Sequence, residues 1–260
     1  MGVHSLSGKP ETKGIMNNSY EDRIRRYLDD PCSFAVEVCG FTPSSQQEPV
    51  LRAMAEPGSR ISVRQGHGVG TTSLLCIGAL WMLSLHLDAK IVFTAPTLPM
   101  LFNILWPELK KWKDNMIPEF RDRLKMTENN IAVIGNYSIT GVARIEKGPE
   151  LFMGVCSNNV LFIADQPSQI PDEVFDGAEG YLGIPSTRMW MMGCPLRDEG
   201  FFYRSQHGPD LRWKKFCLPS TESPFVDPGW VERMKELYGE ESAIYRTRVT
   251  GEFEAKEGKG

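Results

Sequence analysis

Apolar residues in this chain gather in short continuous runs that are separated by longer stretches of helical spacing. Runs such as Lys90–Thr94 (KIVFT) and Val160–Ala164 (VLFIA) show no alternation with polar residues, which is typical of strands buried on both faces of a parallel sheet. Between them, apolar residues recur three and four positions apart. Strands that alternate with helices in this way predict an α/β fold, with a mostly parallel sheet flanked by helices on both faces.

The pattern predicts strands at 60–64, 90–94, 131–135, 138–145, 160–165, 188–193 and 212–218. It predicts helices at 20–28, 33–38, 46–55, 71–87, 106–112 and 242–249, and one that begins at Pro228. Ser44 or Ser45 is expected to cap the third helix, and Asp227 the helix at Pro228. The aromatic residues of Gly200–Ser205 are expected to pack against an edge of the sheet.

The stretch Ile61–Trp81 (ISVRQGHGVGTTSLLCIGALW) reads as a strand, a glycine-rich turn and an apolar helix. This layout predicts a phosphate-binding loop, in which backbone N–H groups and a helix N-terminus converge on an anion. The three glycines, Gly66, Gly68 and Gly70, leave room for the phosphates. Thr72 stands where a hydroxyl would ligate Mg²⁺, but Thr71 occupies the position at which such loops carry lysine.

A second stretch, VLFIADQPSQIPDEVFD, places Asp165 at the carboxyl end of a buried strand. A carboxylate at that point can hold Mg²⁺ through water and face the phosphates from the strand next to the loop strand. The alternative is an aspartate that caps the following turn. The glycine loop upstream favours the metal role.

Charge and cysteine usage narrow the class of protein. The net charge of −4 excludes a uniformly basic surface, although local basic clusters remain as solvated faces or nucleic-acid contacts. The clusters are Arg23–Arg25–Arg26, Lys110–Lys111–Lys113, Arg121–Arg123–Lys125 and Arg212–Lys214–Lys215. Six scattered cysteines without a CxxC pair indicate reduced thiols. The sequence shows no signal peptide and no apolar run of about 20 residues, so a cytosolic protein is expected.

Several ordered blocks resemble the ATPase domain of a large terminase subunit, the motor that packages DNA into tailed-phage capsids. The blocks are QGHGVGTTSLL, FTAPTLPM, LFIADQPSQIPDEVFD, MMGCPLRDEGFFYRS and YGEESAIYRTRVTGEF. The resemblance implies a P-loop NTPase domain over residues 19–253, after a disordered tail at 1–18. Residues 254–260 are expected to be a polar linker, with no nuclease domain in this chain.

The resemblance also implies roles for individual residues. Gln47 matches a glutamine that reads adenine, the alternative being a surface glutamine on a helix. Asp165 matches the Mg²⁺ aspartate, and Gly193 with Cys194 matches a segment that couples hydrolysis to movement. The expected nucleotide-binding residues are Gln47, Gln65, Gly66, His67, Gly68, Val69, Gly70, Thr71 and Thr72. Thr72 and Asp165 are the expected metal ligands.

The sequence departs from the family pattern at residues that bind phosphate and assist hydrolysis. Thr71 replaces the lysine of the Walker A loop, and Gln166 replaces the glutamate that follows the Mg²⁺ aspartate and aligns the attacking water. By resemblance, Arg64 at the front of the loop is a candidate for the missing charge, or else pairs with a nearby carboxylate. Arg144 is a candidate finger for a neighbouring subunit's nucleotide, or else a plain exposed arginine. Gln166, Arg64 and Arg144 form the candidate catalytic set.

Two functions are therefore expected from the resemblance. The first is ATP- and Mg²⁺-dependent packaging of double-stranded DNA with impaired hydrolysis, in a possible homo-oligomeric ring. The partners would be the portal, the procapsid and a small terminase subunit, in the host cytoplasm. The second is a catalytically silent relative that binds nucleotide or serves as a structural subunit. A superfamily 2 helicase-like ATPase is a third reading, which the blocks after Asp165 fit less well.

Overall fold

The computed structural model describes residues 20–134, 139–145, 154–175 and 177–254, and within them the strands form one sheet of eight. The strands are β1 (Arg60–Gln65), β2 (Ala89–Thr94), β3 (Leu124–Met126), β4 (Asn130–Ile134), β5 (Ile139–Ile145), β6 (Asn159–Asp165), β7 (Arg188–Gly193) and β8 (Trp213–Leu218). Their order is β3-β4-β5-β2-β6-β7-β1-β8. All neighbours from β5 to β8 in this order are parallel, whereas β3 and β4 pair antiparallel at one edge. The predicted α/β fold is confirmed.

The helices fill the connections between these strands. They are α1 (Tyr20–Asp29), α2 (Pro31–Glu37), α3 (Gln47–Met54), α4 (Thr71–Leu85), α5 (Leu98–Met100), α6 (Trp106–Asn115), α7 (Pro118–Arg121), α8 (Ala178–Leu182), α9 (Gly200–His207), α10 (Pro228–Tyr238) and α11 (Ala243–Tyr245). Single π-helical segments continue α5 (η1, Leu101–Leu105) and α11 (η6, Arg246–Thr250), and short 3-10 helices lie at Pro167–Gln169, Asp172–Val174 and Ser220–Glu222. No helix among the described residues is both long and apolar enough to cross a bilayer.

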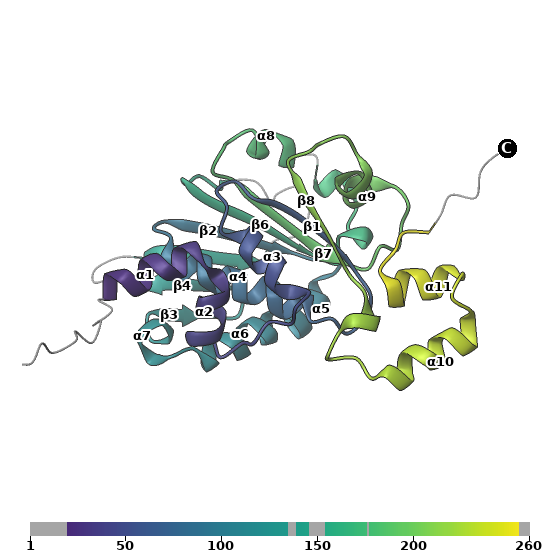
Figure 1. Ribbon diagram of the computed structural model, residues 1–260. Helices are drawn as coiled ribbons and strands as arrows, with labels where there is room; N and C mark the ends of the chain where they lie inside the picture. The colour runs from purple at the N-terminus through teal and green to yellow at the C-terminus, as the bar shows by residue number, and fades with distance from the viewer. Residues whose placement is uncertain (1–19, 135–138, 146–153, 176, 255–260) are drawn as a thin grey trace, which may run out of the picture.

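Alternate residues of the central strands enter two separate cores, one on each face of the sheet. Ile61 and Val63 of β1 belong to the core that also contains α1 to α4, α6 and α7. Ser62 of β1 faces the other side, where its hydroxyl lies 2.7 Å from that of Ser205 on α9. Figure 1 shows the first set of helices below the sheet, and α8 and α9 above it. The helices thus flank both faces, as the apolar runs predicted.

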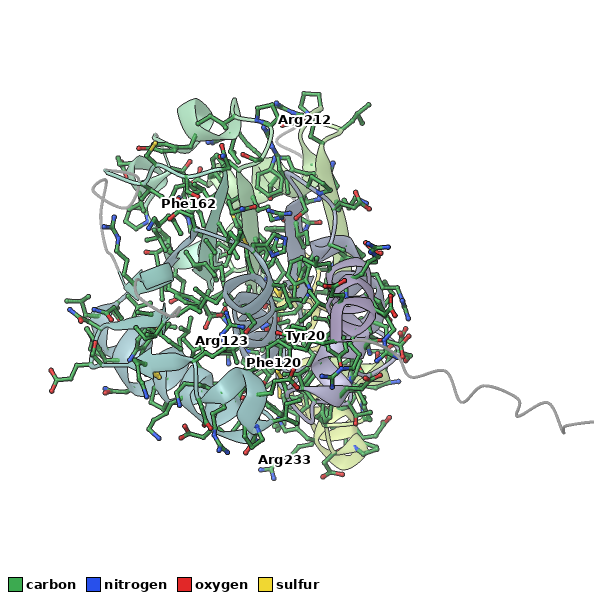
Figure 2. All side chains as sticks on the ribbon, turned by 90° about the vertical axis from the view of Figure 1, so that its left-hand side faces the viewer. Tyr20, Phe120, Arg123, Phe162, Arg212 and Arg233 are labelled. Carbon is green, nitrogen blue, oxygen red and sulfur yellow. The ribbon has the colours of Figure 1, made fainter. Side chains whose placement is uncertain are left out.

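Aromatic side chains illustrate the two layers in Figure 2, where Phe120 lies low in the view and Phe162 higher. Phe120 packs in the α1–α4 core and Phe162 in the core under α8 and α9. The segment 200–205 is the helix α9, and its Phe201 ring meets Trp213 on the edge strand β8 edge to face. The expected aromatic packing at the sheet edge is therefore confirmed.

Local details differ from the prediction at the cap of α3 and in several short elements. Neither Ser44 nor Ser45 caps α3 with its side chain: the Ser44 backbone N–H instead donates to Gln47 Oε1 at 2.9 Å. The antiparallel strand β3 and the helices α5, α7 and α8 were not predicted, because each is too short to show a period. Asp227 caps α10 as expected, accepting from the Gly229 N–H at 3.1 Å. The predicted tails at 1–18 and 254–260 lie outside the described residues, except for Glu254.

Candidate nucleotide site

The glycine loop connects the carboxyl end of β1 with the first residue of α4. Gly68 and Gly70 have φ angles of 75° and 76°, a left-handed conformation that only glycine adopts without strain. At Gly66, a Cβ atom would lie 2.4 Å from the Val249 carbonyl oxygen, so this position requires glycine for space. The first-turn N–H groups of α4 have no intrahelical acceptor and point towards the loop. The segment therefore has the predicted strand, turn and helix layout.

The loop borders a cavity of about 420 Å³. The residues that line it are Gln65, His67, Gly68, Val69, Gly70, Thr71, Thr72, Ser73, Met100, Gln166, Gln169, Cys194 and Leu196. They come from the loop, from the start of α4, from α5 and from the segments that follow β6 and β7. Most of the predicted nucleotide residues are thus brought together at one edge of the sheet. Such cavities at the carboxyl ends of parallel strands are the usual ligand sites of open α/β sheets.

Thr72 and Asp165 meet at this edge. The Thr72 hydroxyl donates to Asp165 Oδ2 at 3.3 Å, while Asp165 Oδ1 is buried and has no hydrogen-bond partner among the described residues. Burial raises the pKa of Asp165 to about 6, although hydrogen bonds from Thr72 and from the backbone of Gln166 lower it. A buried carboxylate oxygen without a partner, next to a threonine hydroxyl, fits a hard cation such as Mg²⁺.

The strand of Asp165 is not the neighbour of the loop strand, and that part of the prediction is wrong. β7 lies between β6 and β1, with Gly193 in register with Arg64 and Met192 with Asp165. Asp165 nevertheless contacts the segment that follows the loop, because the Thr72 hydroxyl at the start of α4 hydrogen-bonds to it past the end of β7. Local sequence could not show this inserted strand, since the order of strands is set by contacts over long separations.

Gln166, Gly193 and Cys194 form a second contact at the ends of β6 and β7. Gln166 is left-handed, with φ 55° and ψ 52°, and its Oε1 accepts from the Cys194 backbone N–H at 3.1 Å. A Cβ on Gly193 would lie 2.7 Å from Gln166 Cα. Burial raises the pKa of the Cys194 thiol to about 11, so the thiol is neutral near pH 7. The residue after Asp165 is thus in direct contact with the predicted coupling segment.

Gln47 is buried at the back of the loop and is not a surface residue, so the alternative reading of Gln47 is wrong. Its Nε2 donates to the Val69 carbonyl oxygen at 2.8 Å, and its Oε1 takes the Ser44 N–H described above. The amide also lies 2.9 Å from the point where a Cβ on Gly70 would stand. Gln47 therefore connects α3 to the loop and holds the loop in place.

His67 is exposed on the loop and lines the cavity from there. Its ring stacks on that of Trp230 in α10, with centroids 6.4 Å apart and an interplanar angle of 16°. Desolvation lowers the pKa of His67, and the charge of Arg248 lowers it further. Gln65 is buried beneath it, with Oε1 unpartnered among the residues that the structure describes.

The structure does not bring Arg64 or Arg144 to the cavity. Arg64 lies on the α9 face of β1, where its Nη1 donates to the Gly251 carbonyl oxygen at 2.7 Å and lines a different cavity. Arg144 is half-buried on β5, in register with Val92 on β2. Asp172, in the segment after Gln166, accepts from the Phe201 N–H at 3.0 Å at the start of α9.

Sequence reasoning missed how the segment after β8 packs on the loop. The Ser220 hydroxyl donates to the His67 carbonyl oxygen at 2.7 Å, and the Ser223 hydroxyl to that of Gly68 at 3.4 Å. The His67 N–H donates to the Arg248 carbonyl oxygen at 2.7 Å. Nothing in the local sequence signals these contacts, because they join residues more than a hundred positions apart.

Comparison with known proteins gives a consistent result. No family profile matches the chain. A probable large terminase subunit of Enterobacteria phage P7 is 25% identical over 253 residues, which is 92% of this chain and 51% of that protein. The large terminase ATPase domain of Thermus phage P74-26 superposes with a TM-score of 0.69 at 14% identity, over 86% of this chain and 99% of that domain. The chain has the fold of a large-terminase ATPase domain.

The large terminase of a thermophilic bacteriophage, solved in complex with ADP, gives a TM-score of 0.63 at 14% identity. That match covers 80% of this chain and 52% of the phage protein. The resemblance to large terminase subunits is therefore confirmed both in sequence and in fold. The chain spans about half the length of the curated relative it matches.

Proposed function

We propose that this chain binds ATP with Mg²⁺ at the glycine loop and acts in viral DNA packaging, as an ATPase whose hydrolysis is slow. The observation that carries the proposal is the pair formed by Thr72 and Asp165, 3.3 Å apart beside the glycine loop. Similarity to the phage P7 protein and to the solved terminases supports it, and one of those structures holds ADP.

The roles follow from the geometry of the cavity. The backbone N–H groups of the loop and the positive end of α4 would hold the phosphates. Thr72 and Asp165 would hold Mg²⁺, which would neutralise charge on the phosphate oxygens. Gln47 would fix the loop and contribute to the base site. Because β7 ends beside Gln166, a change at the phosphates would be passed to Gly193 and Cys194.

Slow hydrolysis follows from two residues. Thr71 carries no charge, and Gln166 cannot accept a proton as a glutamate can. Loss of a positioned general base lowers a rate by roughly 10²–10⁴-fold. Nucleotide binding depends on backbone donors that remain in place, so binding is expected to persist more fully than turnover.

The packaging partners belong to the same proposal. They are double-stranded DNA, the portal and procapsid, and a small terminase subunit, met in the host cytoplasm by a chain that assembles as a ring. The basic clusters do not single out a DNA surface, since many of their residues pair with carboxylates. Arg23 lies 3.0 Å from Glu119, and Arg212 lies 2.8 Å from Asp210. In a ring, Arg144 would act on a neighbouring subunit's nucleotide.

Thr71 and Gln166 also favour a second candidate, a silent nucleotide-binding or structural subunit. Steady-state ATP hydrolysis with Mg²⁺, with and without DNA, separates the two when the parent is compared with the Thr71→Lys/Gln166→Glu double variant. Measurable parent turnover that the double variant raises supports the slow ATPase. Turnover by the double variant alone supports the silent subunit. A parent rate of about 1 s⁻¹, ordinary for an enzyme, contradicts the assignment of impaired hydrolysis.

Calorimetric titration with ATP and Mg²⁺ tests nucleotide binding separately from turnover. Heat of binding in the parent, lost when Thr72 and Asp165 are both replaced, supports the site. A parent that binds neither ATP nor ADP contradicts the proposal as a whole.

A further inference from the structure

The π-helical segment η6 and the residue that follows it pack directly on the glycine loop. Besides the His67 N–H bond to the Arg248 carbonyl, a Cβ on Gly66 would lie 2.4 Å from the Val249 carbonyl oxygen. On the other side, a Cβ on Gly251 would lie 2.7 Å from the Gln65 carbonyl carbon. Backbone therefore lies against backbone at this point, and η6 is held directly against the loop.

Two arginines of η6 are differently placed. Arg246 forms an ion pair with Glu252 at 3.4 Å, and both line the cavity that contains Arg64. Arg248 is exposed and forms no ion pair or side-chain hydrogen bond with another residue in the part of the chain that the structure describes. Residues two positions apart on a helix point to nearly opposite sides, so the side chains of Arg246 and Arg248 lie on different surfaces.

Arg248 lies beside a residue that lines the phosphate cavity, because its carbonyl oxygen accepts the His67 N–H at 2.7 Å. Its charge lowers the pKa of His67, after the larger effect of desolvation, and it opposes the burial that raises the pKa of the Cys194 thiol. His67 and Cys194 line that cavity from two different elements, the loop and the end of β7. Because the backbone of Arg248 contacts the loop and its side chain is exposed, the guanidinium can extend to this cavity.

We propose that Arg248 supplies to the terminal phosphates of a nucleoside triphosphate the positive charge that Thr71 does not supply. This inference rests on the proposed nucleotide binding. Arg64 is committed to the Gly251 carbonyl on the opposite face of β1, and Arg246 to Glu252. Arg248 has no partner to give up among the described residues, and its planar guanidinium can donate two parallel hydrogen bonds to phosphate oxygens.

The assignment separates binding from catalysis. A guanidinium stays protonated and cannot replace the proton acceptor missing at Gln166. The site would therefore hold ATP tightly and hydrolyse it slowly. Because Arg248 belongs to the segment after β8, phosphate binding would also fix that segment against the loop, which is a direct path from the nucleotide to the C-terminal part of the chain.

The test compares Arg248→Gln with Arg246→Gln, which removes the same charge two positions away. Dissociation constants for ATP, ADP and AMP with Mg²⁺ are measured by calorimetry on both variants and the parent. Loss of a charge-assisted hydrogen bond predicts about ten- to a hundredfold weaker ATP binding in Arg248→Gln, a smaller loss for ADP and almost none for AMP. Arg246→Gln is expected to leave all three constants within about twofold, and Arg248→Lys to restore part of the ATP affinity.

A second measurement needs no nucleotide. The pKa of His67, followed by NMR, is expected to rise in Arg248→Gln and to stay unchanged in Arg246→Gln. An unchanged His67 pKa in Arg248→Gln overturns the placement of this charge. A parent that binds nucleotide, together with an Arg248→Gln variant that binds ATP equally well, overturns the inference and leaves the proposed function standing. A parent without nucleotide binding overturns both.

Discussion

Two cavities of about 420 Å³ flank the end of β1. They differ in the partners that the polar and charged side chains around them have within the protein. The phosphate cavity is bordered by the glycine loop and by the ends of β6 and β7. The second cavity, on the α9 face, is lined by Arg64, Tyr203, His207, Arg246, Glu252, Phe253 and Glu254. In the second cavity Arg64 donates to the Gly251 carbonyl oxygen and Arg246 forms an ion pair with Glu252 at 3.4 Å, although Arg246 Nε makes no hydrogen bond among the described residues. Beside the first, Gln65 Oε1 and Asp165 Oδ1 are buried without partners among the described residues.

The difference between the cavities shows that a shift of one position along β1 decides which cavity a side chain lines. Successive residues of a strand point to opposite faces, so Gln65 faces the phosphate cavity and Arg64 the other. In the second cavity the charges of Arg64 and Arg246 lie beside acceptors of the protein itself, Gly251 and Glu252. At the phosphate cavity the unpartnered atom is a carboxylate oxygen, Asp165 Oδ1, which fits a site for a cation. The following predictions test this contrast.

The largest effect is expected from Gln166→Glu, which changes the phosphate cavity from binding towards turnover. A carboxylate there can accept a proton from water and can still accept the Cys194 N–H, so the fold is expected to persist. Mg²⁺-dependent ATP hydrolysis should rise by roughly 10²–10⁴-fold. Gln169→Glu is the control, because Gln169 lines the same cavity but does not follow Asp165. An equal rise in both variants would show that added charge, not the position after Asp165, is responsible.

Asp165→Asn is expected to weaken Mg²⁺-nucleotide binding and yet to stabilise the protein without ligand. The pKa of Asp165 is raised from 3.8 to about 6, so between these values the folded state binds more protons and stability falls as the pH rises. Above pH 6 the charged carboxylate costs about 3 kcal/mol, which asparagine removes. Urea unfolding should show a gain at pH 7 that disappears near pH 4.

The matched control for Asp165 is Asp210→Asn, because this carboxyl has the opposite shift. A hydrogen bond from Arg212 lowers the pKa of Asp210 to about 2, so its charged form stabilises the fold. Asp210→Asn should therefore lower stability at pH 7, and the difference should shrink as the pH falls from about 4 towards 2. For Asp165, a loss of stability at pH 7 would mean that the unpartnered oxygen is already satisfied without a cation.

The comparison also shows which features a sequence can give. The glycine loop and Asp165 could be recognised because each joins a continuous apolar run to a short polar segment, and this signal is local. The sheet face on which Arg64 lies could not be recognised from the sequence. Both faces of β1 are buried, so its residues show no alternation between apolar and polar that would tell the faces apart. Contacts of Gln47, Ser220 and Arg248 with the loop depend on long-range packing that no local pattern records.

Gly66→Ala is expected to have a moderate effect, because it disturbs the contact between the loop and η6. The added Cβ would lie 2.4 Å from the Val249 carbonyl oxygen and 2.3 Å from Ser220 Oγ, so backbone must shift. Overpacking of this kind costs roughly 1–3 kcal/mol, measurable by urea unfolding, and nucleotide affinity should fall with it. Gly180→Ala is the control: on the helix α8 a Cβ meets nothing within 4 Å, and alanine favours the helix.

The smallest effect on nucleotide binding is expected from Arg64→Gln, although Arg64 lies immediately before the loop. Its guanidinium serves the second cavity, where the Gly251 carbonyl would lose a charged donor worth about 1.5–3 kcal/mol. Stability should therefore fall, while the ATP dissociation constant changes by less than about twofold once the variant is folded. Stability and ATP affinity, measured on the same variant, show on which face of β1 the Arg64 guanidinium acts. If ATP affinity fell about tenfold, at a cost of about 1.4 kcal/mol, with stability unchanged, the guanidinium would have to cross to the loop in solution, and the contrast between the two cavities would be lost.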